Sequence, residues 1–381
     1  MGTENVRERR AAIISTLHPE GIPSLWCPPI THYGAKGGID AARSEAHLGR
    51  IIPSAPCLLI PGSTGDGWEM GEAETEALLR CLFPIVASLG GKVLVGALHP
   101  NEAAAKRAME TRMNLALDVA GEGIRAESLL GDPEKAAAAC AKAGIAGFAV
   151  CAPAGIDLSQ GQILAALSDV LDMGLPTAVY QLPQVTKNEI EPETFALLLS
   201  RYPNLYLFKD TSGLDQVALA DIDRGGVFFA RGAEGDYSRW ISRSGNPEGS
   251  AAEHRYDGFL LSSANVFAVD LAEMILALHS GEEAKANQIS GRIDRVVKAV
   301  FAEAAKLPYG NAFSNANRAL DWVMTGGTVP RQLSGLSAPI VPAESIFIEA
   351  PRTHCGEKLP VFFLRFAARA LASEGYVMIG F

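Results

Sequence analysis

The sequence predicts an α/β fold, a (β/α)8 TIM barrel with additional C-terminal helices, and three observations lead to this prediction. Eight short apolar runs are separated by longer amphipathic ones. The apolar runs do not alternate with polar residues, as expected of parallel strands that are buried on both faces. A doubly wound sheet would require a glycine-rich loop after the first strand, and Cys27-Pro-Pro-Ile30 is not such a loop.

The expected strands occupy the apolar runs, and the clearest helices have an apolar stripe at helical spacing. In the helix expected at 159–173, for example, Ile163, Leu167 and Val170 share one face. The strands are Ile22–Cys27, Cys57–Ile60, Val93–Ala97, Ile145–Cys151, Thr177–Tyr180, Leu205–Lys209, Val227–Ala230 and Phe259–Leu261. Further helices are expected at 102–119, 282–306, 314–325 and 358–372.

The domain organisation follows from this order of elements. We expect the barrel to occupy residues 1–280 and a C-terminal helical extension, packed on the barrel, to occupy 281–381. Two stretches are interpreted as insertions, 113–133 and Ser244–Tyr256, both on the side of the barrel where helices lead into strands. Such positions lie away from the chemical face and suit contacts between subunits.

Composition and charge exclude several classes of function. The net charge is −10 and no cluster of Lys and Arg is present, which argues against a nucleic-acid-binding protein. The charged first ten residues precede only a short apolar stretch, Ala11–Ile14, too short for a secretory signal or a membrane span. Six cysteines without CxxC spacing indicate reduced thiols, so a cytoplasmic location is expected. Seven scattered histidines give no metal-binding pattern.

The strand expected at 205–209 places a lysine at its C-terminal end. If its side chains alternate, Leu205, Leu207 and Lys209 share one face. A lysine on an interior face loses hydration, which lowers its pKa and favours the neutral amine that attacks a ketone carbonyl. Taken alone, the alternative of a solvated lysine paired with Asp210 is the commoner situation.

In a barrel, a site is built from the carboxyl ends of several strands, and here these ends carry polar groups. They are Gly62-Ser-Thr-Gly-Asp66, Tyr180-Gln-Leu-Pro-Gln-Val-Thr186, Lys209-Asp-Thr-Ser-Gly213, Gly232-Ala-Glu-Gly235 and Ser262-Ser-Ala-Asn265. This set resembles the dihydrodipicolinate synthase and N-acetylneuraminate lyase family of class I (Schiff-base) aldolases. The resemblance runs from about Pro23 to about Thr325, and the motifs match in identity, order and spacing.

The resemblance implies a role for each motif. Lys209 would form a Schiff base with a 2-keto acid, typically pyruvate, and Tyr180 would shuttle protons. Ser63, Thr64 and Gly65 would hold the keto-acid carboxylate through hydroxyl and amide donors. A nearby ammonium or iminium would lower the pKa of the tyrosine. Taken singly, the glycine loop could be only a turn and the tyrosine only a core aromatic residue.

Two further strand-end residues are candidates for substrate contact. Glu234 follows strand seven and Ser262 follows strand eight. The alternatives are that Glu234 is an acidic loop residue in solvent and that Ser262 only stabilises its loop. Asn265 is interpreted as a residue that stabilises the same loop. A third hypothesis is an unrelated barrel enzyme that uses Glu234 as its base.

The sequence departs from the family pattern at two places. The synthase branch has an arginine where this chain has Val185, which points away from aspartate semialdehyde as the acceptor. The family usually has Thr-Pro followed by two aromatic residues, one of which completes a proton relay across a subunit contact. Here the stretch is Ala152-Pro-Ala-Gly155. Small residues would leave a roomier pocket, so we expect a larger acceptor aldehyde.

The sequence therefore predicts a cytoplasmic Schiff-base lyase or aldolase, or a related dehydratase, that needs neither metal nor organic cofactor. Its expected partners are a small 2-keto acid and copies of itself in a homodimer or homotetramer, and no nucleic acid or membrane. The alternative is a barrel of the same family that keeps Lys209 and Tyr180 but is catalytically silent and serves as a keto-acid-binding or regulatory protein.

Overall fold

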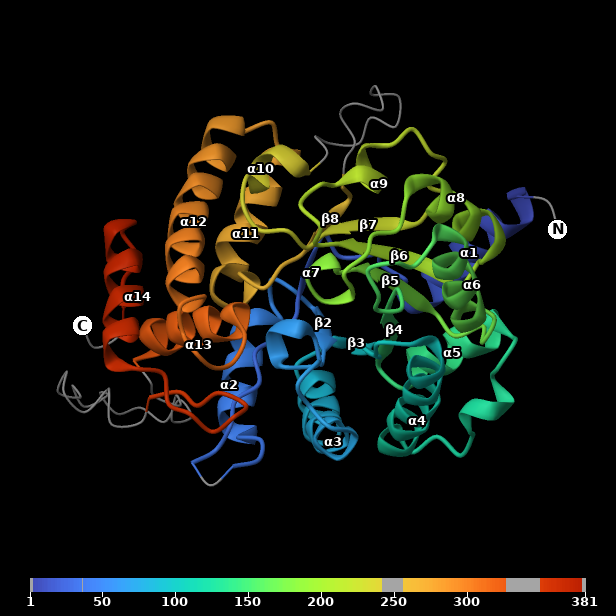
Figure 1. Ribbon diagram of the computed structural model, residues 1–381, viewed down its shortest axis with the longest axis horizontal. Coiled ribbons are helices and arrows are strands. Elements are labelled where there is room, and N and C mark those ends of the chain that lie inside the picture. Colours follow the sequence, from blue (N-terminus) through green and yellow to red (C-terminus); the bar gives the residue numbers. More distant parts are fainter. Residues whose placement is uncertain (1–2, 36, 242–255, 327–349, 379–381) are drawn as a thin grey trace.

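The computed structural model describes residues 3–35, 37–241, 256–326 and 350–378. Its eight strands pair in parallel in chain order, and β1 also pairs with β8, so the sheet closes into a barrel (Figure 1). This confirms the predicted fold class. The strands are β1 Leu25–Cys27, β2 Cys57–Ile60, β3 Lys92–Gly96, β4 Ile145–Cys151, β5 Thr177–Gln181, β6 Leu205–Asp210, β7 Phe228–Arg231 and β8 Gly258–Leu260.

The strands form where apolar runs are long enough to be covered on both sides. Every residue of β4 and β6 is buried, because side chains fill the barrel interior on one face and helices cover the other. β1 is shorter than predicted and begins at Leu25 rather than Ile22. Pro23 lies in the missing part and has no N–H for a strand ladder.

Helices surround the barrel, and all five of the predicted helices are present with ends shifted by a few residues. The larger helices are α1 Thr3–Leu17, α2 Ala41–Ile51, α3 Glu72–Ser88, α4 Glu102–Ala120, α5 Pro133–Lys142, α6 Gln160–Leu171, α8 Pro192–Arg201, α11 Ala264–His279, α12 Glu283–Ala304, α13 Ala312–Thr325 and α14 Val361–Ser373. Single turns are α7 Pro183–Thr186, α9 Gln216–Leu219, α10 Tyr237–Trp240 and the 3-10 turns η1 Ser63–Gly65 and η2 Ala126–Ser128.

Helix α1 lies across the amino-terminal end of the barrel, which the sequence did not indicate. Arg10 of this helix is buried, and its guanidinium donates to the carbonyl oxygens of Leu205 at 2.7 Å and Gly225 at 2.6 Å. It also donates to the carbonyls of Leu199 and Tyr202 at 2.6 and 2.8 Å. A buried cation is tolerated here because several acceptors replace its hydration.

The structure describes only one of the two stretches that the sequence analysis interprets as insertions, 113–133, in full. Residues 113–120 belong to α4, so the additional segment between β3 and β4 is shorter and is followed by α5, which packs against α1. The segment from Ser244 lies outside the described residues except for Tyr256, and so do residues 330–349 and 379–381 of the C-terminal extension.

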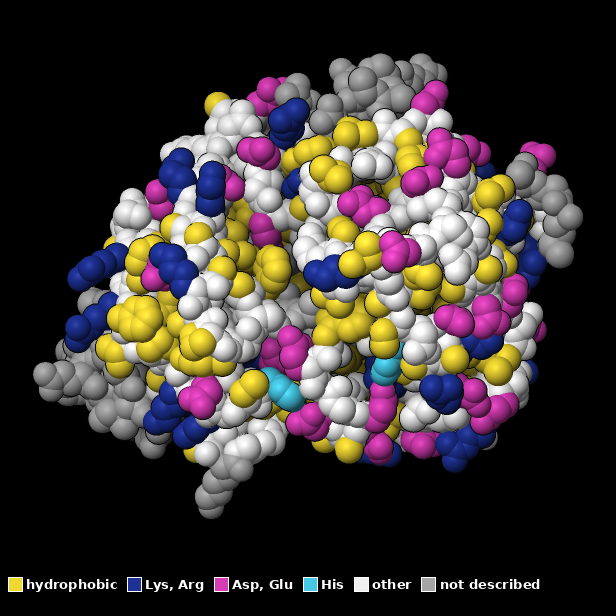
Figure 2. Space-filling view, viewed as in Figure 1, with side chains coloured by type: hydrophobic (Ala, Val, Ile, Leu, Met, Phe, Trp, Pro, Cys, Tyr) yellow, Lys and Arg dark blue, Asp and Glu magenta, His cyan; other side chains and the backbone are white. Residues whose placement is uncertain are grey.

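Helices α12, α13 and α14 gather on the side of the barrel away from α1 (Figure 1). α12 packs against α11 and α13, and α13 also contacts η1 at the carboxyl end of the barrel. Exposed apolar side chains occur on this part of the surface, among them Phe313 of α13 and Phe362 of α14 (Figure 2). The boundary between the barrel and the C-terminal helical extension, placed at 280/281 from the sequence, stays a prediction. In the described ranges, none of the helices combines the length and apolar character that crossing a bilayer requires.

Candidate active site

Lys209 and Tyr180 lie side by side at the carboxyl ends of neighbouring strands. In the barrel register Cys151 of β4 pairs with Tyr180 of β5, and Tyr180 pairs with Lys209 of β6. Residues paired in this way stand at one level of the sheet and on one face. The Lys209 Nζ atom lies 4.0 Å from the centroid of the Tyr180 ring. Both side chains are buried, with exposed fractions of 4% and 2%.

Burial changes the acid–base state of the lysine. Loss of hydration lowers the pKa of Lys209 from 10.5 to about 7, and nearby Cys151 and Glu234 oppose this shift. Asp210 is not its partner, because that carboxylate accepts hydrogen bonds from the Ser212 N–H at 2.8 Å and the Tyr256 hydroxyl at 3.3 Å. The alternative of a solvated Lys209–Asp210 ion pair therefore does not describe this structure. A substantial fraction of the amine is unprotonated at neutral pH.

A glycine at the end of β7 leaves room for the lysine side chain. A Cβ atom at Gly232 would lie 2.8 Å from Lys209 Cε and 2.5 Å from Thr211 Cγ2. Both distances are well below van der Waals contact, so a larger residue would displace one of these groups.

Tyr180 remains a phenol in this environment. Burial raises its pKa above the usual value, and hydrogen bonding to the Ser63 and Thr211 side chains offsets only part of the shift. The sequence predicts a lower pKa caused by a nearby ammonium or iminium. The pKa is raised instead because loss of hydration, which disfavours the phenolate, is the largest cause of the shift. Tyr180 is thus a proton donor until a positive charge forms next to it.

The predicted carboxylate loop is a 3-10 turn directly after β2. Gly65 is tightly enclosed, since a Cβ there would lie 2.7 Å from the Pro29 carbonyl oxygen. Ser63 Oγ accepts a hydrogen bond from Trp68 Nε1 at 3.2 Å. As the first residues of the turn, Ser63 and Thr64 have no intrahelical acceptor for their N–H groups. Such free N–H groups and hydroxyls suit a carboxylate.

Glu234 and Ser262 contact each other. The Ser262 hydroxyl donates to Glu234 Oε1 at 2.6 Å, and the Ser263 N–H donates to the same oxygen at 3.0 Å. The other carboxylate oxygen accepts from the hydroxyls of Ser263 at 2.7 Å and Tyr237 at 2.9 Å. Glu234 is therefore fixed by four donors and joins the ends of β7 and β8. Asn265 holds its loop together, with its amide nitrogen bonded to the carbonyls of Pro28 and Ser262.

A buried charged network behind the lysine was missed by sequence reasoning. Asp215 accepts from the Tyr256 hydroxyl at 2.6 Å and pairs with Arg231 through both carboxylate oxygens, at 3.1 and 3.2 Å. Arg231 also donates to the carbonyls of Ala233 and Gly235, on either side of Glu234. The network joins the ends of β6 and β7. No sequence pattern signals it, because its members meet only in the folded chain.

The two departures from the family pattern both lie on loops at this end of the barrel. Val185 is on the single turn α7 and is exposed. Ala154 and Gly155 are tied to neighbouring loops, since their N–H groups donate to the carbonyls of Pro100 at 2.8 Å and Thr186 at 2.9 Å. The stretch that lacks the aromatic pair is therefore an ordered loop.

One group of possible metal ligands was also not found from the sequence. Among the described residues, ligand atoms of His32, His47 and Asp321 lie within 4.8 Å of one another. Arg50 Nη2 lies 2.5 Å from Asp321 Oδ1 and 3.2 Å from His47 Nδ1. The guanidinium occupies the position from which a metal ion would bind both groups, so we assign no metal to this cluster.

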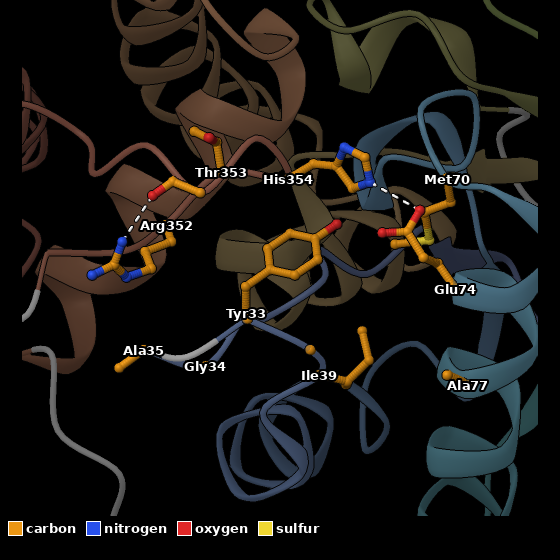
Figure 3. Close-up of a pocket in the computed structure, with 13 residues that line it drawn as sticks. Tyr33, Gly34, Ala35, Ile39, Met70, Glu74, Ala77, Arg352, Thr353 and His354 are labelled. Atoms are coloured by element: carbon orange, nitrogen blue, oxygen red, sulfur yellow. Dashed lines mark hydrogen bonds and ion pairs between the residues drawn. The ribbon is translucent and has the colours of Figure 1, made fainter.

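A cavity separate from the lysine lies between the β1–α2 loop, the start of α3 and the C-terminal segment. Its volume is about 280 Å³, and its lining includes Tyr33, Met70, Glu74 and His354 (Figure 3). His354 Nε2 lies 3.3 Å from Glu74 Oε2, and the His354 ring meets the Tyr33 ring edge to face. No sequence pattern indicates this cavity.

The fold and this lysine–tyrosine pair define the class of protein, a closed (β/α)8 barrel with a buried amine at the carboxyl ends of its strands. Residues 128–317 match the sequence model of the dihydrodipicolinate synthetase family. This range includes Tyr180 and Lys209. The chain is a divergent member of that family.

Individual relatives are distant. The chain is 31% identical over 176 residues to a 4-hydroxy-tetrahydrodipicolinate synthase from Erythrobacter litoralis, an alignment that covers 45% of this chain and 57% of that relative. It is 25% identical over 338 residues to one from Agrobacterium fabrum, with 88% and 97% covered. YagE, a prophage protein of the dihydrodipicolinic acid synthase family from E. coli K12 solved in complex with pyruvate, superimposes with a TM-score of 0.64 at 17% identity, covering 93% of this chain and 99% of YagE.

Proposed function

We propose that this protein is a Schiff-base-forming lyase or aldolase that acts on a 2-keto acid of the pyruvate type. The observation that carries the proposal is the buried Lys209 amine, which has a pKa of about 7 and lies 4.0 Å from the Tyr180 ring. Membership of the family and the pyruvate in the YagE structure support the choice of donor.

In the proposed reaction the neutral Lys209 amine attacks C2 of the keto acid, and the carbonyl oxygen becomes a hydroxyl. Tyr180 donates a proton to that hydroxyl as water leaves and the iminium forms. The iminium withdraws electrons from the adjacent carbon, which allows a carbon–carbon bond to be made or broken there. The positive charge lowers the pKa of Tyr180 at this stage and stabilises the phenolate left by that transfer, which can then accept a proton from the substrate.

The carboxylate of the keto acid is assigned to the η1 turn. Ser63 and Thr64 provide hydroxyl and N–H donors without a permanent cation that would compete with the amine, whereas the Gly65 N–H already donates to the Gly62 carbonyl at 3.0 Å. Glu234 and Ser262 remain candidates for contact with the rest of the substrate. In the structure the Ser262 hydroxyl donates to the Glu234 carboxylate at 2.6 Å, so substrate binding would require this hydrogen bond to be exchanged for one to the substrate.

The acceptor is proposed to be a larger aldehyde than the small acidic partners of the synthases. Val185 brings no cation to the mouth of the barrel, and Ala154 and Gly155 have little bulk. Retro-aldol release of pyruvate across a panel of 2-keto acids of increasing chain length tests this point. Activity confined to short acidic acceptors would contradict it.

A second candidate function is a catalytically silent keto-acid-binding barrel, and the absent aromatic pair at Ala154-Gly155 favours it. It predicts pyruvate adducts on Lys209 without turnover of any substrate in the panel. If the protein were instead an enzyme that uses Glu234 as its base, Lys209→Ala would keep most of the activity.

The main proposal also includes a homodimeric or homotetrameric state and a cytoplasmic location. Light scattering of the purified protein tests the oligomeric state.

A further inference from the structure

We propose that the C-terminal helix α13 is a positioning element of the substrate site, which orients the N–H groups of the η1 turn toward the keto-acid carboxylate. The residues that perform this role are Asn311, Ser314 and Arg318. The inference rests on the proposed function, because it assigns the η1 turn to carboxylate binding.

The N-cap residue of α13 and two residues of the helix contact the η1 turn and the residue that ends it. Asn311 Nδ2 donates to the Ser63 carbonyl at 3.1 Å, and Ser314 Oγ donates to the Thr64 carbonyl at 2.7 Å. Arg318 completes the row with an ion pair to Asp66, the residue that ends the turn. The spacing of three and then four residues places them on consecutive turns of one helix face.

These contacts set the direction of the backbone donors. In a trans peptide the C=O of one residue and the N–H of the next point in opposite directions. Asn311 therefore fixes the Thr64 N–H by holding the Ser63 carbonyl. The Thr64 N–H is consequently directed away from α13. Without the bond from Asn311, the Ser63 carbonyl keeps only the 3.2 Å bond from the Asp66 N–H, so the peptide between Ser63 and Thr64 is held less firmly.

The Arg318–Asp66 pair anchors the end of the same turn. Both side chains are 2% exposed, and Asp66 has a left-handed backbone conformation with φ of 63°. The Tyr33 hydroxyl donates to the same Asp66 oxygen at 2.8 Å. Arg318 also approaches the Thr31 carbonyl at 3.3 Å, and Thr31 Oγ1 donates to the Gly65 carbonyl at 2.7 Å. A non-glycine residue with positive φ persists only where its surroundings hold it.

The Tyr33 ring extends from this anchor into the 280 Å³ cavity beside the C-terminal segment (Figure 3). The anchor is therefore connected to α13 on one side and to the segment around His354 on the other. Helix α13 and the segment around His354 both come from the last part of the chain, which explains how an extension outside the eight repeated units bears on the site.

The test measures pyruvate half-saturation by borohydride trapping and intact-mass spectrometry of the full chain. Asn311→Asp keeps an oxygen that caps α13 through the Ser314 N–H but removes the donor to the Ser63 carbonyl and to Glu69 Oε1, which lies 3.2 Å from Asn311 Nδ2. Ser314→Ala removes the donor to Thr64. Each variant is expected to raise the half-saturating pyruvate concentration about 3- to 10-fold, as loss of one hydrogen bond implies, while adduct yield at saturation stays within about 2-fold.

The matched control is Asn101→Asp, the same change at the cap of α4, where Asn101 accepts from the Ala104 N–H at 2.9 Å without touching η1. Its half-saturation should stay within about 2-fold of wild type. Unchanged half-saturation in the α13 variants, or an equal rise in the control, would overturn the inference. If the wild-type protein traps no keto acid, the proposed function fails instead.

Discussion

At the scale of a single residue, the burial of Lys209 favours its reactivity and opposes the stability of the fold. Burial makes its amine nucleophilic, because the charged form loses hydration, and the same burial makes the residue costly to the fold. Tyr180 is buried for the same reason and stays protonated. In the proposed mechanism the pair supplies a neutral nucleophile and a proton donor.

A first prediction concerns stability. Lys209→Met removes the desolvated amine and keeps much of the side-chain volume, so it should stabilise the protein by about 1–3 kcal/mol at pH 7. The pKa of Lys209 is lowered on folding, so the unfolded chain binds more protons between pH 7 and 10.5 and wild-type stability rises with pH in that window. The gain from Lys209→Met should therefore shrink toward pH 10.5. Denaturant unfolding across this range measures it, and a destabilised variant would contradict the account.

A second prediction concerns the pH dependence of imine formation. Only the unprotonated amine attacks, and its pKa is about 7. The rate of adduct formation with pyruvate should rise about tenfold per pH unit below 7 and level off above about pH 8. Rapid-quench borohydride trapping gives the rate. A midpoint near 10 would show that the lysine is solvated.

The strand ends determine the site at the scale of elements. β4, β5 and β6 bring Cys151, Tyr180 and Lys209 to one level of the barrel. Gly232, at the end of β7, has no side chain and so leaves room for the lysine.

Gly232→Ala should lower adduct formation at least about tenfold, because its methyl group would meet the Lys209 side chain. Gly213→Ala, a loop glycine with no atom near its Cβ position, is a control for general backbone strain. Equal effects of both changes would contradict a steric role for Gly232.

Much of this level of organisation was predictable from the sequence. The apolar runs predicted all eight strands and the motifs at their ends, since a fully buried strand has few alternatives to an unbroken apolar run. The network of Asp215, Arg231 and Tyr256 was not predictable, because its partners are distant in sequence and none has a periodic pattern. The contacts of Arg318 with Asp66 join residues 252 positions apart and were missed for the same reason.

At the scale of the whole molecule, the two ends of the barrel have separate tasks. At the amino-terminal end, Arg10 of α1 donates hydrogen bonds to backbone carbonyls, whereas the carboxyl end carries the candidate site.

Arg10→Met should destabilise the protein by about 2–4 kcal/mol, since several buried carbonyls lose their donor. It should leave pyruvate half-saturation unchanged. Denaturant unfolding and adduct titration separate these effects, and a changed half-saturation with normal stability would contradict the division of tasks.

The most direct measurement is treatment of the protein with pyruvate and borohydride, followed by peptide mass spectrometry. We expect a reduced pyruvyl adduct on Lys209 that is absent in Lys209→Ala. An adduct on another lysine, or none with pyruvate or other 2-keto acids, would contradict the assignment of a Schiff-base site to this barrel.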